Sequence, residues 1–247
     1  MKTVVNIEKL AKSYQGEPVL ADLSLRIGEG TFISLVGPNG CGKTTLVKLI
    51  AEVEQQDSGD ITVRDGTKVS FVFQNYQESF LPWRTVEDNI ALPLEITGDL
   101  KKDDKLASVI KEFNLGEHKN KQPYELSGGW AQLTAIARAV VVDPDILILD
   151  EPFKSLDFHA AQNVMGKLLA YCEKKRITTI LVSHDIDQAI LFADRLLVFS
   201  QRPGIIKHDL DIQLPRPRKV AHLGETQFFH LKNTTLKLIY DGFKNAG

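Results

Sequence analysis

One glycine-rich segment has the residue types and the spacing of a phosphate-binding loop. It runs from Gly37 to Thr44 and reads Gly-Pro-Asn-Gly-Cys-Gly-Lys-Thr, after an apolar run at 31–36 and before a helical period at 44–53. In such a strand–loop–helix context, consecutive backbone N–H groups at the helix start bind phosphate oxygens. The residues expected to contact a nucleoside triphosphate are Gly37, Pro38, Asn39, Gly40, Cys41, Gly42, Lys43, Thr44 and Thr45.

Three side chains of this loop have distinct expected roles. Lys43 is expected to reach the β- and γ-phosphates, and the Thr44 hydroxyl is placed to ligate Mg²⁺. Cys41 lies at a helix N-terminus, a position that lowers the pKa of a thiol. We therefore expect alkylation of Cys41, slowed by bound ATP.

Two acidic residues follow a buried strand and are placed to hold a metal ion and to activate water. The apolar run 146–149 precedes Asp150 and Glu151. Asp150 should therefore emerge at the carboxyl edge of a parallel sheet, where open α/β sheets bind their ligands. We predict that Asp150 holds Mg²⁺ through water, and that Glu151 orients or deprotonates the attacking water.

Three further side chains are candidates for contacts with the nucleotide. Gln74 closes an expected strand at 69–73 and is predicted to contact Mg²⁺ or the attacking water. His184 follows an apolar strand and is predicted to hydrogen-bond the γ-phosphate, although a lone histidine is more often structural. Tyr14 is a candidate stacking platform for adenine, with simple packing as the alternative.

The elements expected around these residues indicate an α/β fold. Strands are expected at 3–10, 19–27, 31–36, 60–63, 69–73, 146–149, 178–182 and 195–199, with helical patterns between them. This order predicts a P-loop NTPase core that has a parallel sheet and an antiparallel N-terminal β part.

A helical subdomain is predicted inside this core. Residues 76–141 hold only helical patterns and turns, with Thr85 as the cap of one helix and a second helical period at 101–114. We divide one cassette, 1–247, into a catalytic core (1–75 and 142–215), the helical subdomain (76–141) and a C-terminal extension (216–247). The extension is predicted to end in a helix at about 226–241.

The composition is that of a globular protein and argues against several other classes. Hydrophobic residues make up 43% and charged residues 25%, and the net charge of −2 offers no basic field for nucleic acid. Cys41 and Cys172 are far apart, which argues against a disulfide or zinc framework. Neither a signal peptide nor an apolar run of roughly 18 residues is present. We expect a cytosolic protein, or a peripheral one on the cytoplasmic face of the cell (inner) membrane.

Together with the string Leu-Ser-Gly-Gly at 126–129, these motifs resemble the nucleotide-binding subunit of ATP-binding-cassette (ABC) transporters. The resemblance covers essentially the whole chain. Tyr14 falls on the adenine-stacking aromatic, 37–45 on Walker A and Gln74 on the Q-loop. The string at 126–129 matches the signature, 146–151 Walker B, 155–157 the D-loop and His184 the switch histidine.

The resemblance implies a head-to-tail homodimer with two ATP molecules sandwiched at its interface. Each ATP would contact Walker A of one subunit and, in trans, Ser127, Gly128 and Gly129 of the other. Asp157 would belong to the D-loop. The implied cofactors are ATP and Mg²⁺, the implied metal-site residues are Thr44, Gln74 and Asp150, and the implied catalytic residues are Glu151, His184 and Gln74.

Longer strings resemble the nitrate/sulfonate/taurine uptake branch of this family, among them 81–90, 150–153 and 183–189. An importer of a small anionic or heterocyclic solute is implied, with integral membrane permease subunits as partners and a solute-binding protein as an indirect one. Phe80, Leu81 and Trp83 are predicted to form an exposed patch, which by resemblance belongs to the groove for the permease. The alternative is that Phe80 and Trp83 pack the subdomain core.

The chain departs from the family pattern at Trp130 and Leu133, after the signature, and at Lys154, before the D-loop. None of these is expected to touch phosphate or metal, so we still expect ATP hydrolysis. One alternative function is a soluble ABC ATPase of an assembly machine, such as iron–sulfur cluster biogenesis. A cassette acting on DNA or ribosomes lacks support, because the chain has neither long insertions nor a basic face. A P-loop kinase would have no need of the signature string.

Overall fold

The computed structural model describes residues 2–154, 156–216, 218 and 220–244, and its contacts divide the chain into two compact units. The first unit is Met1–Thr67 with Arg176–Gly247, and the second is Lys68–Lys175. The predicted helical subdomain, 76–141, lies within the second unit. The predicted boundaries of core, subdomain and C-terminal extension stay predictions, and the extension includes 217, 219 and 245–247, which lie outside the described residues.

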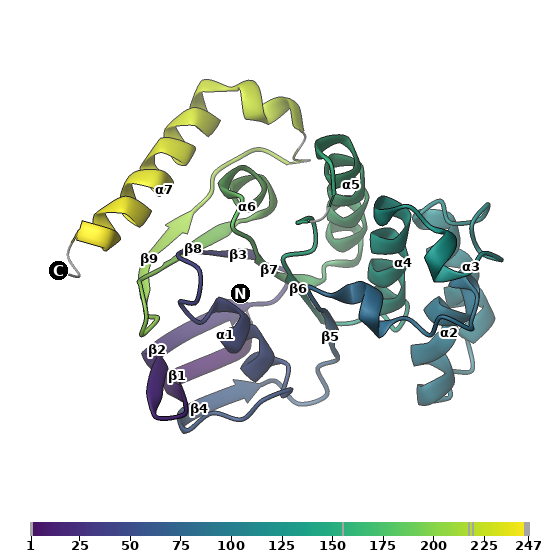
Figure 1. Ribbon diagram of the computed structural model, residues 1–247, viewed down its shortest axis with the longest axis horizontal. Coiled ribbons are helices and arrows are strands. Elements are labelled where there is room, and N and C mark those ends of the chain that lie inside the picture. Colours follow the sequence, from purple (N-terminus) through teal and green to yellow (C-terminus); the bar gives the residue numbers. More distant parts are fainter. Residues whose placement is uncertain (1, 155, 217, 219, 245–247) are drawn as a thin grey trace. The chain divides into compact units, whose positions relative to one another are not determined.

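An antiparallel sheet forms the N-terminal part of the first unit (Figure 1). Its strands are β1 (Thr3–Tyr14), β2 (Glu17–Gly28) and β4 (Ser58–Val63), in the order β2-β1-β4. β1 pairs with β2 from Thr3 opposite Gly28 to Tyr14 opposite Glu17. Apolar residues of β1 and β2 are buried while alternate polar ones face solvent, as half-buried strands require. The predicted antiparallel N-terminal part is confirmed.

Parallel strands form the centre of the same unit. β3 (Phe32–Val36) pairs in parallel with β7 (Thr178–Val182) on one side and with β8 (Arg195–Phe199) on the other. Every residue of β3 and β7 is buried, which is why apolar residues predominate in both strands, with Ser34, Thr178 and Thr179 as buried polar exceptions. β9 (Ile206–Asp211) adds an antiparallel edge to β8. β9 was not among the predicted strands, because most of its side chains are polar and its pairing partner, not its own pattern, defines it.

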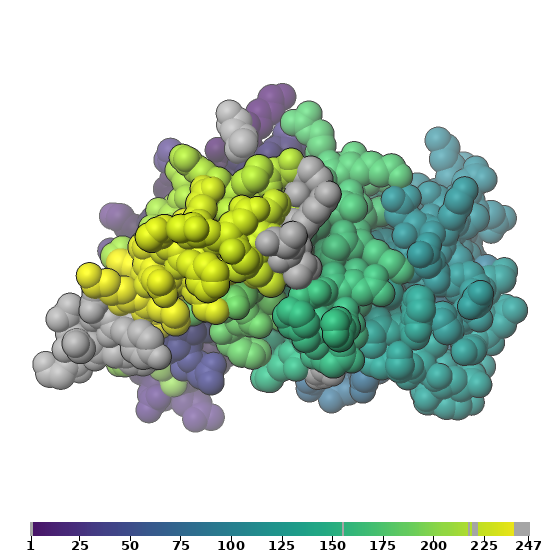
Figure 2. Space-filling view, turned by 90° about the horizontal axis from the view of Figure 1, so that it is seen from above, coloured from purple at the N-terminus to yellow at the C-terminus, as the bar shows by residue number. Residues whose placement is uncertain are grey.

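The helices of the first unit are α1 (Lys43–Ile50), α6 (Ile186–Phe192) and α7 (Thr226–Lys244), with a short 3-10 helix, η3 (Val220–Gly224), before α7. α1 ends before the predicted residue 53, since Glu52 takes a left-handed φ of 56°. α7 contacts α6 and β8, and its yellow residues cover one face of this unit in Figure 2. The predicted C-terminal helix is thereby confirmed.

The second unit combines two parallel strands with the helices labelled α2, α3, α4 and α5 in Figure 1. β5 (Val69–Val72) pairs with β6 (Ile146–Asp150). The helices are α2 (Val86–Thr97), α3 (Lys102–Glu112), α4 (Gly128–Val140) and α5 (Phe158–Lys175), with 3-10 turns η1 (Tyr76–Ser79) and η2 (Pro123–Glu125). α4 contacts α2, α3 and α5 and is the central helix of this unit.

The start of α2 confirms the cap predicted from the sequence. The Thr85 hydroxyl accepts a hydrogen bond from the Asp88 backbone N–H at 3.1 Å, and the Asp88 carboxylate accepts one from the Thr85 N–H at 3.3 Å. This reciprocal capping box satisfies two backbone donors that the first turn leaves unpaired. Within the described residues, no helix combines the length and the apolar character needed to cross a membrane.

Candidate nucleotide-binding and catalytic site

The glycine-rich loop links β3 to α1 in the first unit, as the sequence predicts. Gly42 caps α1 with a φ of 100°, and a Cβ atom there would lie 2.6 Å from the Leu20 side chain. A Cβ atom on Gly37 would lie 2.8 Å from the Phe199 Cβ atom. Both positions therefore need glycine for steric reasons, and the second also places the loop tightly against β8.

Lys43, the first residue of α1, is hydrogen-bonded to the backbone of the loop. Its side chain is buried, with 6% of its surface exposed, and its ammonium donates to the carbonyls of Gly37 at 2.9 Å and Pro38 at 2.8 Å. A cation and a helix N-terminus thus share one loop, and both attract anions. This arrangement fits a bound phosphate group.

Cys41 differs from the expectation of an activated thiol. The side chain is 1% exposed, and burial raises the pKa of the thiol, although the Lys43 ammonium 3.5 Å from its sulfur opposes the shift. Desolvation of the thiolate therefore outweighs the helix N-terminus and the cation at this site. The predicted low pKa of Cys41 is wrong.

We accordingly expect Cys41 to react slowly with iodoacetamide in the native protein. Because the pKa is raised, the thiolate fraction should keep growing at pH values where a free cysteine is already ionised, and the rate should keep rising with pH. Mass spectrometry of timed, quenched samples measures this, with urea-unfolded protein as the reference. Equal rates for native and unfolded Cys41 would contradict the buried position.

Tyr14 ends β1 with its ring partly exposed, at 40%. The Tyr14 hydroxyl donates to the Glu54 carboxylate, which also accepts from the Lys48 ammonium at 3.0 Å. Partial burial raises the pKa of the Tyr14 hydroxyl, and the hydrogen bond to Glu54 adds to the increase. The ring is therefore held by its hydroxyl end, which suits the predicted stacking role.

His184 lies in the link between β7 and α6, and its side chain is exposed. The Asp185 carboxylate caps α6 by accepting from the backbone N–H groups of Asp187 and Gln188. The Ser183 hydroxyl accepts from the Asp185 N–H at 3.1 Å. His184 is thus carried by a turn that is hydrogen-bonded on both sides, in the same unit as the glycine-rich loop.

In the second unit, Glu151 follows β6, and the side chains of Gln74 and Lys154 contact it. Gln74 donates to the Glu151 carboxylate at 3.2 Å, and the Lys154 ammonium lies 2.9 Å from the same oxygen. Glu151 also has a left-handed φ of 47°, a conformation that is uncommon for residues with a side chain. Asp150, the last residue of β6, is 3% exposed. The structure thus brings together the predicted Gln74 and Glu151.

Sequence reasoning noticed Lys154 only as a departure from the family and missed its contact with Glu151. The available signal was the spacing of an acid and a base three residues apart directly after a strand. In a helix that spacing predicts a surface ion pair. Here the two residues form a turn instead, in which the Lys154 N–H donates to the Glu151 carbonyl at 3.3 Å.

Ser127 caps α4, and Gly128 and Gly129 form its first turn. These residues line a hollow of about 250 Å³ together with Trp130, Leu133 and Asp157. Asp157 itself caps the start of α5, its carboxylate accepting from the Ala160 N–H at 2.9 Å. The predicted signature and D-loop residues therefore meet at one hollow, except that Ser155 lies outside the described residues.

Comparisons with known proteins agree with this geometry. The family profile described as ABC transporter matches residues 20–154, more than half of the chain. The chain belongs to the ABC transporter family. An aliphatic sulfonates import ATP-binding protein, SsuB 2 of Pseudomonas syringae pv. tomato, is 41% identical over 84% of this cassette and 87% of its own length.

Other relatives of this ABC cassette are longer than it is. The bicarbonate transport ATP-binding protein CmpC of Synechococcus elongatus is 40% identical and the nitrate import ATP-binding protein NrtC of the same organism is 38% identical, each over 89% of this chain. The chain spans 35% of the length of either protein. Among solved structures, a dimeric post-hydrolysis state of the ATP-binding cassette MJ0796 bound to ADP and Pi has a TM-score of 0.74 and 27% identity. That match covers 85% of this chain and 100% of the other.

The residues predicted to form an exposed apolar patch after Gln74 differ in their exposure in the structure of this ABC cassette. Trp83 is 73% exposed, whereas Phe80 is buried at 7%. Phe80 packs edge-on against the Tyr76 ring and under the Arg138 guanidinium, 5.0 Å from its ring centre. The predicted exposure of Phe80 is wrong, because those two neighbours cover the ring. Leu81 is partly exposed, and its N–H donates to the Asn89 side chain at 2.9 Å.

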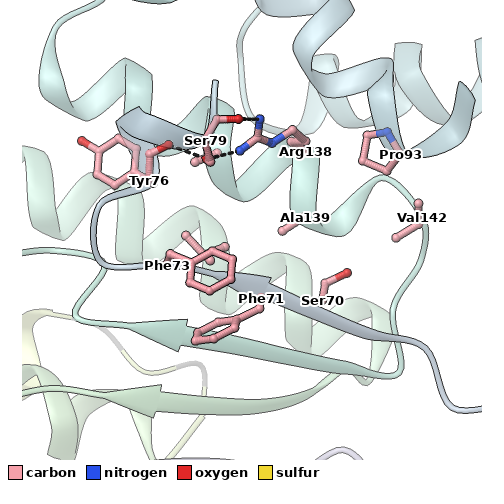
Figure 3. A pocket seen from close by; sticks show the side chains of 11 residues that line it. Ser70, Phe71, Phe73, Tyr76, Ser79, Pro93, Arg138, Ala139 and Val142 are labelled. Carbon is pink, nitrogen blue, oxygen red and sulfur yellow. Dashed lines mark hydrogen bonds between the residues drawn. The ribbon is translucent and has the colours of Figure 1, made fainter. Parts of the chain in front are cut away.

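Two adjoining hollows lie in the second unit, and we call them together the α2–α4 groove. Their volumes are about 790 and 200 Å³, and they share Ser70, Ser79, Pro93, Arg138 and Val142 as lining residues. Figure 3 shows the smaller one, with the Phe71 and Phe73 rings below and Arg138 reaching over to Ser79. The sequence did not predict this groove because its lining comes from β5, η1, α2 and α4, which are separated along the chain.

Proposed function

We propose that this chain is the ATP-binding and hydrolysing subunit of an ABC importer for a small anionic solute. One observation carries the proposal. The loop from Gly37 to Lys43 starts α1, requires glycine where it touches its surroundings, and holds a buried ammonium on its own carbonyls. Membership of the ABC transporter family supports ATP as the anion that this loop binds.

The first unit would bind the nucleotide. Loop N–H groups and Lys43 would hold the phosphates, the Thr44 hydroxyl would face the metal ion, and Tyr14 would stack on adenine. His184 would donate a hydrogen bond to the γ-phosphate from the turn after β7. These assignments rest on the common placement of the loop, Tyr14 and His184 in one unit.

Mg²⁺ fits the donor set of the chain. Thr44, Gln74 and Asp150 offer a hydroxyl, an amide and a carboxylate oxygen, which are the hard ligands that Mg²⁺ prefers. When bound with ATP, the ion would neutralise charge on the phosphates. In the described part of the chain, no three or more His, Cys, Asp or Glu side chains gather into a metal-binding group.

Glu151 is the proposed base for the attacking water. Its carboxylate is oriented by Gln74 and Lys154, at 3.2 and 2.9 Å. A carboxylate fixed in this way can accept a hydrogen bond from water and take its proton as the water oxygen bonds to the γ-phosphorus and the bond from that phosphorus to the departing ADP oxygen breaks.

The signature would act on ATP bound by a second copy of the chain. Dimeric structures of the cassette MJ0796 support a homodimer in the nucleotide-bound state. In it, Ser127, Gly128 and Gly129 would place the N-terminus of α4 against the γ-phosphate, and Asp157 would lie beside them at the same hollow. Closure of the dimer on ATP would be the step that drives transport.

The solute and the partners are inferred from the relatives. Those named above are import or transport proteins for aliphatic sulfonates, bicarbonate and nitrate, all of them anions. The chain would therefore work on the cytoplasmic face of the membrane, bound to permease subunits that receive solute from a binding protein. The same names favour import over the alternative of a soluble ATPase in iron–sulfur cluster assembly.

The proposed function is tested in two steps. The purified chain should hydrolyse ATP in the presence of Mg²⁺. The Glu151→Gln variant with ATP should then co-purify, in mild detergent, with a polytopic membrane protein in defined stoichiometry. ATP hydrolysis without any membrane partner would move the function to the assembly machine, and absence of ATP binding would refute the proposal as a whole.

Trp83→Ala should uncouple transport from ATP hydrolysis. An exposed tryptophan is the residue type that contributes most at protein interfaces, and its truncation costs about 2 kcal/mol or more where it is a hot spot. We expect permease binding to weaken more than tenfold while the ATPase rate of the isolated chain is unchanged. Phe229→Ala, an exposed aromatic on α7, is the matched control. Equal losses of transport and isolated ATPase activity would contradict the proposed role of Trp83.

A further inference from the structure

The 3-10 turn η1 joins Gln74 to the α2–α4 groove, and side chains fasten it to α4 in two places. One attachment is near the C-terminal end of α4, through Arg138, and the other is at its first residue, Gly128. All of these residues belong to the second unit and are described. Neither attachment is used by the chemistry proposed above.

Arg138 forms the attachment inside the groove, as Figure 3 shows. Its guanidinium donates to the Ser79 carbonyl at 2.7 Å and also to the Ser79 hydroxyl, which in turn donates to the Tyr76 carbonyl at 2.5 Å. The same guanidinium lies over the Phe80 ring. Burial lowers the pKa of Arg138. A partly buried guanidinium with this fork of contacts holds η1 in one position.

Tyr76 forms the attachment at the signature. The side chain is 5% exposed, and its hydroxyl donates to the Gly128 carbonyl at 3.2 Å. Gly128 is the second of the three signature residues that would contact ATP in trans. The Tyr76 ring meets the Phe80 ring edge-on, with their centres 6.3 Å apart. Phe80 therefore lies between the two attachments and contacts the side chains of both.

We propose that Tyr76 is a positioning residue for the turn Ser127–Gly129, and that Arg138 keeps Tyr76 in place. η1 then makes the wall of the groove and the start of α4 a single rigid piece. A partner segment that occupies the groove against Ser79 and Arg138 would act on the signature through the Tyr76 hydroxyl. This consequence rests on the proposed function. The attachment of η1 to α4 through Tyr76 and Arg138, which we call the clamp, is a property of the second unit alone.

The alternative is that the Tyr76 hydroxyl only satisfies a buried polar group, as most buried tyrosines do. The two roles differ in what the loss of the hydroxyl does. A merely structural hydrogen bond would change stability, while a positioning bond would loosen the start of α4 and slow the step that needs the signature. Binding of ATP to a single subunit should be unaffected in the second case, because Tyr14 and the glycine-rich loop, which would hold adenine and the phosphates, lie in the first unit.

The test uses Tyr76→Phe in the full chain, since this change removes one hydroxyl and keeps the ring. Hydrogen–deuterium exchange of the peptide over 126–134 should become about fivefold faster, which is the effect of losing one hydrogen bond, with the other peptides unchanged. Steady-state kinetics should show a fall in kcat of about fivefold with KM for MgATP unchanged. Arg138→Lys, which keeps the charge but loses the fork, should change both quantities in the same direction.

Tyr171→Phe is the matched control, because Tyr171 is a tyrosine of α5 that is buried to a similar degree in the same unit, at 4% exposure. It should change neither the exchange of 126–134 nor kcat. If Tyr76→Phe leaves the exchange of 126–134 at the wild-type rate, the clamp is overturned. A normal kcat in an active wild-type background would overturn the positioning role. A wild-type chain without ATPase activity would instead refute the proposed function, and the exchange measurement would still decide the clamp.

Discussion

Replacing Glu151 with glutamine is expected to lower the rate of ATP hydrolysis at least a hundredfold and to leave ATP binding intact. General-base catalysis contributes about 10²–10⁴-fold, and an amide at this position keeps the shape of the side chain but cannot accept the proton. Gln74 and Lys154 can still donate to the amide oxygen, so the local turn should persist. Phosphate release measures the rate, and a fluorescent ATP analogue measures binding.

The Glu151→Gln variant should dimerise more strongly with ATP than the native chain does, because nucleotide stays bound when it is not hydrolysed. Sedimentation with and without MgATP measures this. Glu112→Gln is the control, since Glu112 is a partly exposed acid at the end of α3 whose ion pair with Lys174 lies outside the proposed site. A Glu151→Gln protein that binds ATP but remains monomeric at high concentration would contradict the proposed dimer. A normal hydrolysis rate would remove Glu151 from its role as the base.

Lys43→Ala is expected to weaken MgATP binding by about ten- to a hundredfold and to abolish measurable hydrolysis. Hydrogen bonds to charged groups contribute about 1.5–3 kcal/mol each, and a phosphate would lose its cation. The carbonyls of Gly37 and Pro38 would also lose the ammonium that holds the loop closed. Isothermal titration with MgATP measures the affinity.

Lys111→Ala serves as the comparison, because Lys111 is an exposed lysine in the last turn of α3. Circular dichroism of Lys43→Ala should match that of the native chain, since α1 retains its capping glycine and its buried apolar face. Unchanged ATP affinity in a folded Lys43→Ala protein would mean that the glycine-rich loop does not bind the phosphates.

The local pattern of apolar, capping and glycine residues was sufficient to predict most elements of the fold. The run 32–36 before Gly37 is apolar except for Ser34, and the run 146–149 before Asp150 is continuous and apolar. They form β3 and β6, which are buried along their whole length. Thr85 with Asp88 three residues later predicts the start of α2, since the two groups satisfy each other's backbone donors. Glycines of the loop could be interpreted in the same way, because a left-handed φ is a property of one residue and its neighbours. The edge strand β9 has no such pattern and depends on β8 for its definition.

Some features of the candidate site could be predicted from local sequence pattern and others could not. Lys43, Asp150 and His184 lie at or after the carboxyl ends of apolar strands, which already indicates phosphate chemistry, because open α/β sheets bind their ligands at those ends. The burial of a side chain and its contacts with residues distant in the chain cannot be predicted from local pattern in this way. Cys41 has a raised pKa because the folded chain desolvates it, and Phe80 is covered by Tyr76 and Arg138.

The contacts that would tune the chemistry are tertiary in the same sense. Gln74 reaches Glu151 across 77 positions of the chain, and Tyr76 reaches Gly128 across 52. Neither pair leaves a mark in the spacing of residues, since hydrogen-bond partners are chosen by the packing of η1, α4 and β6. The amino-acid order therefore determined the kind of chemistry and the elements that carry it. Which side chains orient the base and the signature was decided by packing alone, because those contacts exist only when the elements are assembled.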